Sequence, residues 1–189
     1  AAKETLQADE WGMIINLSHK AIVNDDMGAF DTLAVAAGEA AAYTVETAFF
    51  DMLAENSGNG PTMNDGNAFF HSSHNNIGAA AAPSVAQLSA MRAIMRKQKD
   101  PAAKRFIKVT PATFLGPVGM DDDVRVLVNA EYDPEDVALQ KPNSVRGMVQ
   151  NILGAPELEG DDYYIFGSNG SRRTAPFEIA FVNGQATPV

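Results

Sequence analysis

One long helical pattern constrains the fold of this chain more than any other feature of its sequence. Between Asn24 and Gly58, apolar residues recur at the spacing that lines one helix. They are Phe30, Leu33, Ala34, Ala37, Ala41, Val45, Ala48, Phe49, Met52 and Leu53. Roughly 30 residues at about 1.5 Å each predict a rod about 45 Å long. Asn24 or Asp25 fits the N-cap and Gly58 fits the position after the helix. So long a rod indicates an architectural role.

Composition and charge exclude several classes of protein. With 189 residues, 46% of them hydrophobic, the chain can bury the core of one large or two small domains. Its 24 acidic and 14 basic residues give a net charge of −10, which argues against gripping nucleic acid through phosphate contacts. The absence of cysteine excludes disulfides and thiolate chemistry. No apolar run reaches the length of a membrane span and no leader pattern is present, so we expect no membrane association.

The rest of the chain predicts an α+β fold with mostly antiparallel pairing. Ser84 and Gln87 form a capping box before a second helix, which Asp100-Pro101 ends, and Asp121-Asp122-Asp123 begins a third. Residues 57–83 form a long connection with a turn at Asp65-Gly66, and residues 131–145 are another loop. Strands are expected at 13–17, 106–110 with an extension at 113–115, 148–153, 163–166 and 177–182.

His71 and His74, with Asp65 nearby, have the only spacing that suggests a metal site. Three such ligands can hold zinc with an open position, so a metal-dependent hydrolase is the alternative function. The segment reads as a loop and lacks the glutamate of a helical zinc-protease motif, which favours hydrogen bonds that order the loop.

The run Asp121-Asp122-Asp123 could bind magnesium, but at a helix start it is better explained by capping and the helix dipole. His19 has no context of a catalytic triad. We therefore predict no catalytic residues, no bound metal and no cofactor.

Three segments, in this order, resemble the Mu-like phage or prophage major head subunit, a family of tailed-phage major capsid proteins. They are AIVNDDMGAF at 21–30; DGNAFFHSSHNN at 65–76 followed by LSAMR at 88–92 and MRKQK at 95–99; and YYIFG at 163–167 leading to FEIAFVNGQ at 177–185. The resemblance implies a structural, self-assembling virion protein without enzymatic activity.

The resemblance also implies the tailed-phage capsid fold, in which a long spine helix packs on an antiparallel sheet in a peripheral domain and an α/β axial domain is attached. Residues 1–83 would then form the peripheral domain, with the spine at about 26–56, and residues 84–168 the axial domain. Residues 169–189 would return to the peripheral sheet. The start at Ala1 and the short segment after the Asn183-Gly184 turn predict that the chain is trimmed.

The implied partners are other copies of the chain in pentamers and hexamers, together with scaffold and portal proteins. Packaged DNA would be contained in an icosahedral shell without sequence-specific binding, which suits an acidic protein. Such a protein is made in the cytoplasm of the bacterial host and ends in the virion. Another virion component, such as an adaptor or tail protein, is a further alternative.

Overall fold

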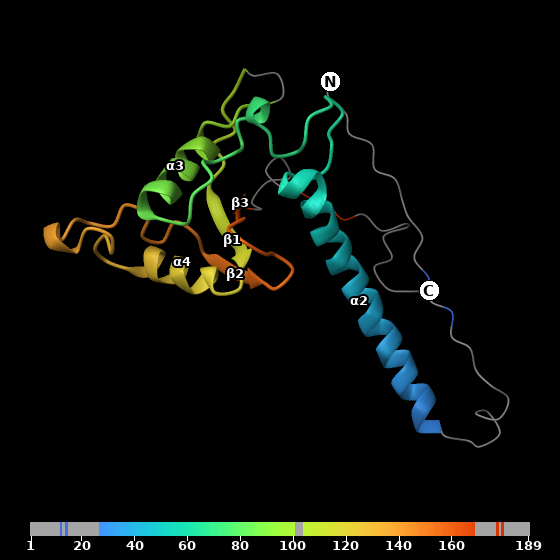
Figure 1. The fold of residues 1–189 in the computed structure, drawn as a ribbon. Coiled ribbons are helices and arrows are strands. Elements are labelled where there is room, and N and C mark those ends of the chain that lie inside the picture. The colour runs from blue at the N-terminus through green and yellow to red at the C-terminus, as the bar shows by residue number, and fades with distance from the viewer. Residues whose placement is uncertain are drawn as a thin grey trace.

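The longest element is the helix α2, which projects from a small sheet covered by two shorter helices (Figure 1). The structure is a computed structural model, and it describes residues 12, 14, 27–100, 104–168, 177 and 179. Its elements are α2 (Met27–Gly58), η1 (Ser72–His74), α3 (Val85–Arg96), β1 (Pro111–Pro117), α4 (Met120–Asn129), η2 (Val137–Leu139), β2 (Asn151–Ala155) and β3 (Tyr164–Gly167). No helix in this part of the chain is long and apolar enough to cross a membrane.

The predicted rod is confirmed as a helix whose regular turns continue to Ala54. Glu55 turns to an extended conformation, with ψ of 151°, and Asn56 and Ser57 then take positive φ values of 51° and 60°. Asparagine tolerates this left-handed conformation better than most residues. The Asn56 amide also donates to the carbonyl oxygen of Gly60 at 2.8 Å. The predicted N-caps lie outside the described residues.

The sheet has the strand order β2-β1-β3 and mixed direction, so the expectation of mostly antiparallel pairing is wrong for half of it. β1 pairs antiparallel with β3 but parallel with β2. Parallel neighbours need a crossover connection, and here α4 with the loop that follows carries the chain back to the starting end of the sheet. Because β1 and β2 run in the same direction, they cannot form an antiparallel hairpin.

The expected strand at 106–110 is also wrong. Its residues form one isolated bridge, between Lys99 and Phe106, and Lys108 has a positive φ of 58° that interrupts an extended path. The strand β1 begins instead at Pro111 and contains the predicted extension at 113–115. The strands predicted at 148–153 and 163–166 are found with shifted bounds, as β2 and β3. Those predicted at 13–17 and 177–182 fall on residues that the structure does not describe, apart from isolated positions.

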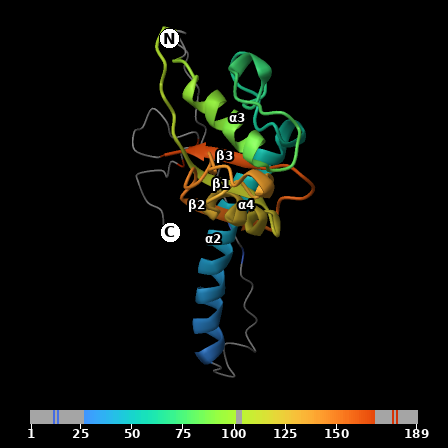
Figure 2. The same cartoon turned by 90° about the vertical axis from the view of Figure 1, so that its left-hand side faces the viewer.

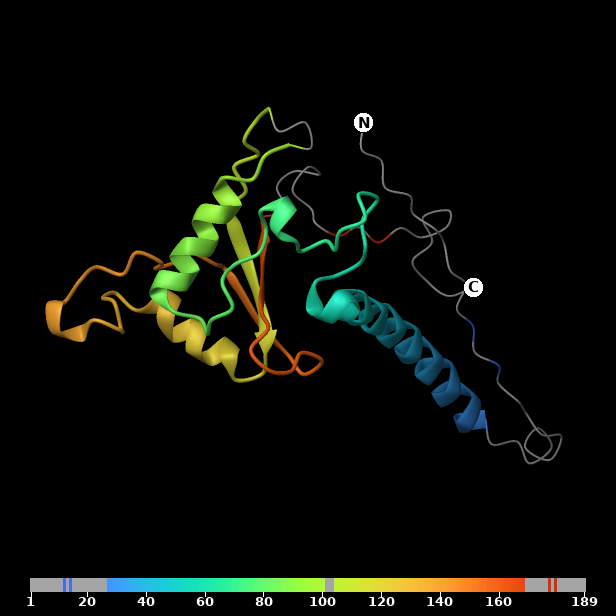
Figure 3. The same cartoon turned by 45° about the horizontal axis from the view of Figure 1, so that its top comes forward.

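The two faces of the sheet bury two different hydrophobic clusters, because successive strand residues point to opposite sides. Phe114 faces α3 and α4, in a cluster with Val85, Leu88, Val124, Leu127, Val128, Val145, Met148 and Val149. Leu115 faces the end of α2, in a cluster with Leu53, Ala155 and Tyr164. Figure 3 shows α3 and α4 on one side of the strands and α2 on the other. The sheet therefore joins two cores.

Among the described residues, α2 packs on this sheet only through its last turns. Phe49 and Phe50 flank the buried Leu53, whereas Val35 and Tyr43 are 63% and 66% exposed. The rest of the helix extends away from the sheet in both views (Figures 1 and 2). In the described part of the chain, α2 is thus anchored by one end to a small mixed sheet. The expected packing of α2 on an antiparallel peripheral sheet involves strands at 13–17 and 177–182, which lie outside the described residues apart from isolated positions.

The capping box at the start of α3 is only half formed. The Ser84 hydroxyl accepts from the backbone N–H of Gln87 at 3.0 Å, as predicted. The side chain of Gln87 donates instead to the carbonyl oxygen of Ala79, in the segment that leads to the helix. This bond fixes the approach of residues 77–83 to α3, and the helix ends at Arg96, ahead of Asp100.

Candidate functional site

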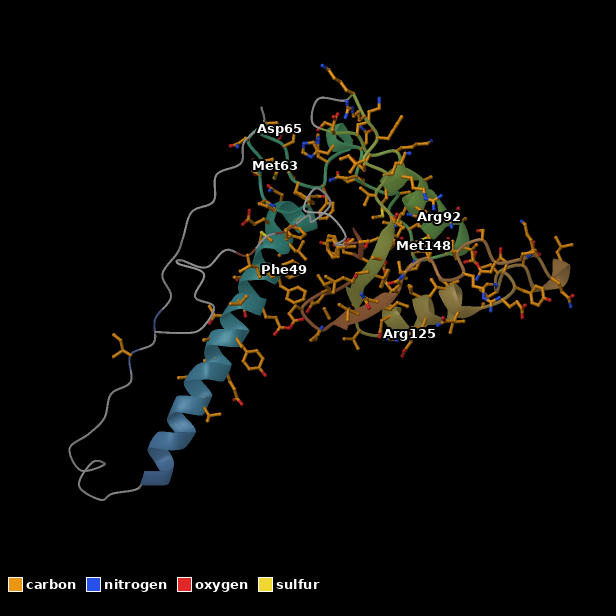
Figure 4. All side chains as sticks on the ribbon, turned by 180° about the vertical axis from the view of Figure 1, so that it is seen from behind. Phe49, Met63, Asp65, Arg92, Arg125 and Met148 are labelled. Carbon is orange, nitrogen blue, oxygen red and sulfur yellow. The ribbon has the colours of Figure 1, made fainter. Side chains whose placement is uncertain are left out.

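The three residues considered as a metal site lie in one loop beyond the end of α2, where His74 contacts Asp65 and His71 contacts Ser73. A narrow hairpin closes at the Asp65-Gly66 turn, with a bridge between Thr62 and Ala68. His74 follows on the short helix η1, and its Nε2 lies 2.8 Å from Asp65 Oδ2. Figure 4 shows Met63 and Asp65 on this loop, beyond Phe49 of α2. Sequence spacing therefore identified a real cluster.

Hydrogen bonds occupy the groups that would have to bind a metal. His74 Nδ1 lies 2.9 Å from the carbonyl oxygen of Phe69, so both ring nitrogens of His74 face oxygen acceptors. His71 Nδ1 contacts the hydroxyl of Ser73 at 2.7 Å and accepts from its N–H. The described residues contain no group of three His, Cys, Asp or Glu side chains able to hold an ion. The arrangement confirms the interpretation of loop-ordering hydrogen bonds.

The same contacts favour the charged forms of both partners. The carbonyl oxygen of Phe69, and then the carboxylate of Asp65, raise the pKa of His74 above its ordinary value of 6.5. Hydrogen bonds from Asn67 and then from His74 hold the pKa of Asp65 well below its ordinary 3.8. An imidazolium can donate from both nitrogens, which a neutral ring cannot. The cluster is thus a charged clamp across the loop.

We expect this clamp to depend on pH. Because the folded-state pKa of His74 is raised, its contribution is complete below pH 6.5 and is lost as the pH rises through the raised value. The contribution of Asp65 is complete above pH 3.8 and is lost as the pH falls toward the lowered value. Loop order should therefore be greatest between these two values. Amide hydrogen exchange of residues 61–76 across this range measures it.

Asp65→Asn tests the cause directly. The substitution keeps the side-chain shape but removes the charge, so the pKa of His74, followed by its NMR ring signals, should fall. The matched control is Asp51→Asn, which removes an exposed carboxylate of α2 and should leave that pKa unchanged. An unchanged His74 pKa in Asp65→Asn would show that the Phe69 carbonyl alone sets it.

The acidic run at 121–123 begins α4, as predicted. Asp121 Oδ1 accepts from the N–H of Gly119 at 3.0 Å, and its Oδ2 lies 3.7 Å from Arg125 on the next turn. A Cβ on Gly154 would lie 2.8 Å from Asp121 Oδ1, so the neighbouring strand needs glycine there. The three acids lie in the first turn of α4, which agrees with helix-dipole compensation, but the N-cap is Gly119 and no side chain caps the helix, so the capping part of the interpretation is wrong. The third histidine, His19, lies outside the described residues.

A junction that the sequence analysis missed joins α2 to the sheet. The hydroxyl of Tyr164, on β3, donates to the carbonyl oxygen of Gly58 at 2.8 Å, and burial raises the pKa of Tyr164. Beside it the rings of Phe70 and Phe166 lie 5.3 and 6.2 Å from that of Tyr164. A hollow of about 240 Å³ opens next to this junction, between residues 57–59, 76–81 and 161–165. The arrangement is that of a structural joint.

A second missed feature is the buried Asn143, in a stretch predicted only as loop. Its Nδ2 donates to the carbonyl oxygens of Leu127 and Ala130 at 2.6 and 3.0 Å, and its Oδ1 accepts from Val145 N–H at 3.0 Å. Arg92, labelled in Figure 4, donates to the carbonyl oxygen of Ser144 at 2.9 Å. No local pattern distinguishes such an asparagine from those in turns.

Comparison with known proteins agrees with a structural role. The family model described as phage capsid protein matches residues 2–189, nearly the whole chain. No curated protein and no solved structure matches it. Proteins of this family are virion components that assemble into multimeric shells, which decides against the hydrolase alternative. On the extent of this match, the chain belongs to the phage capsid protein family.

Proposed function

We propose that the chain is the major head subunit of a Mu-like phage or prophage. In this role it forms pentamers and hexamers that close into an icosahedral shell around DNA. The observation that carries the proposal is the family match over residues 2–189. The three segments quoted above support the narrower Mu-like assignment. Scaffold and portal proteins are the further partners that such a role requires.

We also propose the division into a peripheral domain (1–83), an axial domain (84–168) and a return to the periphery (169–189). One observation supports it: α3, α4 and one face of the sheet share a hydrophobic cluster drawn entirely from residues 85–165. The second cluster combines Leu53 and Phe70 from the first range with Leu115 and Tyr164 from the second. In this division the second cluster is the contact between the domains.

The test is electron microscopy of the concentrated chain, alone and with scaffold protein. We expect rings of five or six subunits, or closed shells. Leu53→Ala removes a fully buried side chain at the contact between the domains and should reduce assembly, because α2 loses its anchor. The neighbouring Ala54→Ser, at an exposed position of α2, should assemble normally. Subunits that remain monomeric under every condition would count against the proposal.

A further inference from the structure

Positive charge is concentrated in one short hairpin of this acidic chain. The hairpin spans 96–108, of which the structure describes 96–100 and 104–108. It starts at the end of α3 and is closed by backbone bonds from the Asp100 N–H to the Arg105 carbonyl and from the Ile107 N–H to the Gln98 carbonyl. It carries six of the chain's 14 basic residues, all exposed: Arg96, Lys97, Lys99, Lys104, Arg105 and Lys108. None of these six side chains forms an ion pair with any residue that the structure describes. We name this segment the basic hairpin.

Asp100 does not neutralise the basic hairpin from within. It is the only acid in the segment, and its Oδ1 accepts from the backbone N–H groups of Lys104 and Arg105 at 2.8 and 3.3 Å. Its carboxylate therefore shapes the turn. At the centre of the hairpin Phe106 is 56% exposed, with the ammonium of Lys99 5.4 Å from the ring centroid. The segment therefore combines an exposed aromatic ring with exposed cations.

Negative charge is concentrated in the loop between β2 and β3. Its four carboxylates are exposed and belong to Glu157, Glu159, Asp161 and Asp162. Within the described ranges no hydrogen bond or ion pair engages any of them. The exposed apolar side chain of Val118, just after β1, lies at the same end of the sheet. We name residues 157–162 the acidic loop.

Sheet register places these two segments at opposite ends of one domain. The basic hairpin precedes β1, whose first residue Pro111 pairs with Gly167. The acidic loop follows β2, whose last residue Ala155 pairs with Pro117 at the other end of β1. Seven strand residues at about 3.3 Å each separate the two ends by about 20 Å. Figures 1 and 3 show the hairpin and the loop at the two ends of the strands. The segments cannot meet within one copy.

We propose that the acidic loop of one copy binds the basic hairpin of the next copy. Such a contact joins two different surfaces of the same chain, and heterologous contacts of this kind close into rings when the rotation between copies allows it. Charge complementarity selects a second copy as the occupant, because neither segment has an ion-pair partner among the described residues and the two carry opposite charges. The inference rests on the proposed self-assembly and specifies which surfaces make one of its contacts.

DNA is the other polyanion that a basic hairpin could meet. A contact with DNA would leave the four carboxylates of the acidic loop without a cation. It would also act against the chain's net charge of −10. The two occupants predict different results when charges are exchanged between the segments, which is the basis of the test.

The test exchanges charges between the two segments of the full chain. One variant carries Lys97→Glu with Lys104→Glu, and a second carries Glu157→Lys with Glu159→Lys. Sedimentation velocity at about 50 mM and about 500 mM salt, where screening is far stronger, measures assembly. Each variant alone should associate at least tenfold more weakly than the unmodified chain, because like charges then face each other. Lys141→Glu, an exposed reversal outside both segments, should associate normally.

Restoration of assembly is the decisive readout. An equimolar mixture of the two variants should assemble again, and so should a single chain carrying all four substitutions. Circular dichroism verifies that each variant is folded.

If the unmodified chain assembles and both variants assemble equally well, the inference is wrong while the proposed function stands. Loss of assembly without rescue in the mixture, together with loss of binding to a labelled DNA duplex by the hairpin variant, would identify DNA as the occupant and overturn the inference. An unmodified chain that never assembles contradicts the proposed function itself.

Discussion

Phe114→Ala is expected to destabilise the folded chain by about 3–5 kcal/mol, the range for removing a buried aromatic ring. Phe114 is fully buried on the central strand, between α3 and α4, and its ring stacks on that of Tyr163 with centroids 5.3 Å apart. The ring also fills the space beside Gly116, where an added Cβ would lie 2.9 Å from it. Because β1 is the middle strand, the surrounding atoms cannot collapse into the cavity without moving the sheet.

Urea unfolding of the full chain, followed by far-UV circular dichroism, measures this change. The matched control is Phe106→Ala, which removes the same ring from a position 56% exposed and should cost less than about 1 kcal/mol. Equal losses in the two variants would mean that the core does not lie where the structure puts it. Phe106→Ala should still weaken assembly, since its exposed ring belongs to the basic hairpin.

Asn143→Ala is expected to cost about 2–4 kcal/mol, although it removes only a small polar side chain. Three hydrogen bonds are lost, and two backbone carbonyls at the end of α4 and one N–H beyond it lose their partner while buried or partly buried. An orphaned buried group bears its full desolvation penalty, which exceeds the net value of the bond itself. The loop 131–145 should also become more accessible to protease.

Asn151→Ala provides the control for this prediction. Asn151 is exposed on the edge strand β2 and makes one long contact, 3.4 Å from its Nδ2 to Thr113 Oγ1. Its removal should change the free energy of unfolding by less than about 0.5 kcal/mol. If Asn143→Ala proved as mild as Asn151→Ala, water would be replacing the lost bonds, and the region would be open to solvent.

The elements that sequence predicted well are those with local signals. The repeated apolar spacing of α2, the serine cap of α3 and the acidic first turn of α4 are each written within a few residues. The hairpin at Asp65-Gly66 is likewise a local turn signal, and the hydrogen bonds of His74 follow from it.

The errors come from long-range choices. The direction of β2 depends on the end of the sheet to which α4 and the following loop return the chain. The spacing of apolar residues does not predict this, so the parallel pairing of β1 with β2 was missed. The strand expected at 106–110 has suitable side chains, but Lys108 adopts a positive φ and the residues join a hairpin instead. Tyr164 donates a hydrogen bond to Gly58, which is 106 positions earlier in the chain. Asn143 donates to Leu127, which is 16 positions earlier. The roles of both side chains therefore depend on the tertiary fold.

Within the described part of the chain α2 is anchored at one end, which has a mechanical consequence for a protein that must tile a curved surface. From Leu53 to Met27 the helix extends about 39 Å at 1.5 Å per residue. A rotation of about 5° at the aromatic joint therefore moves the far end by about 3 Å while the helix itself stays rigid. Slight adjustments around Leu53 and Tyr164 would let identical subunits meet their neighbours at more than one angle, with the interiors on both sides of the sheet unchanged.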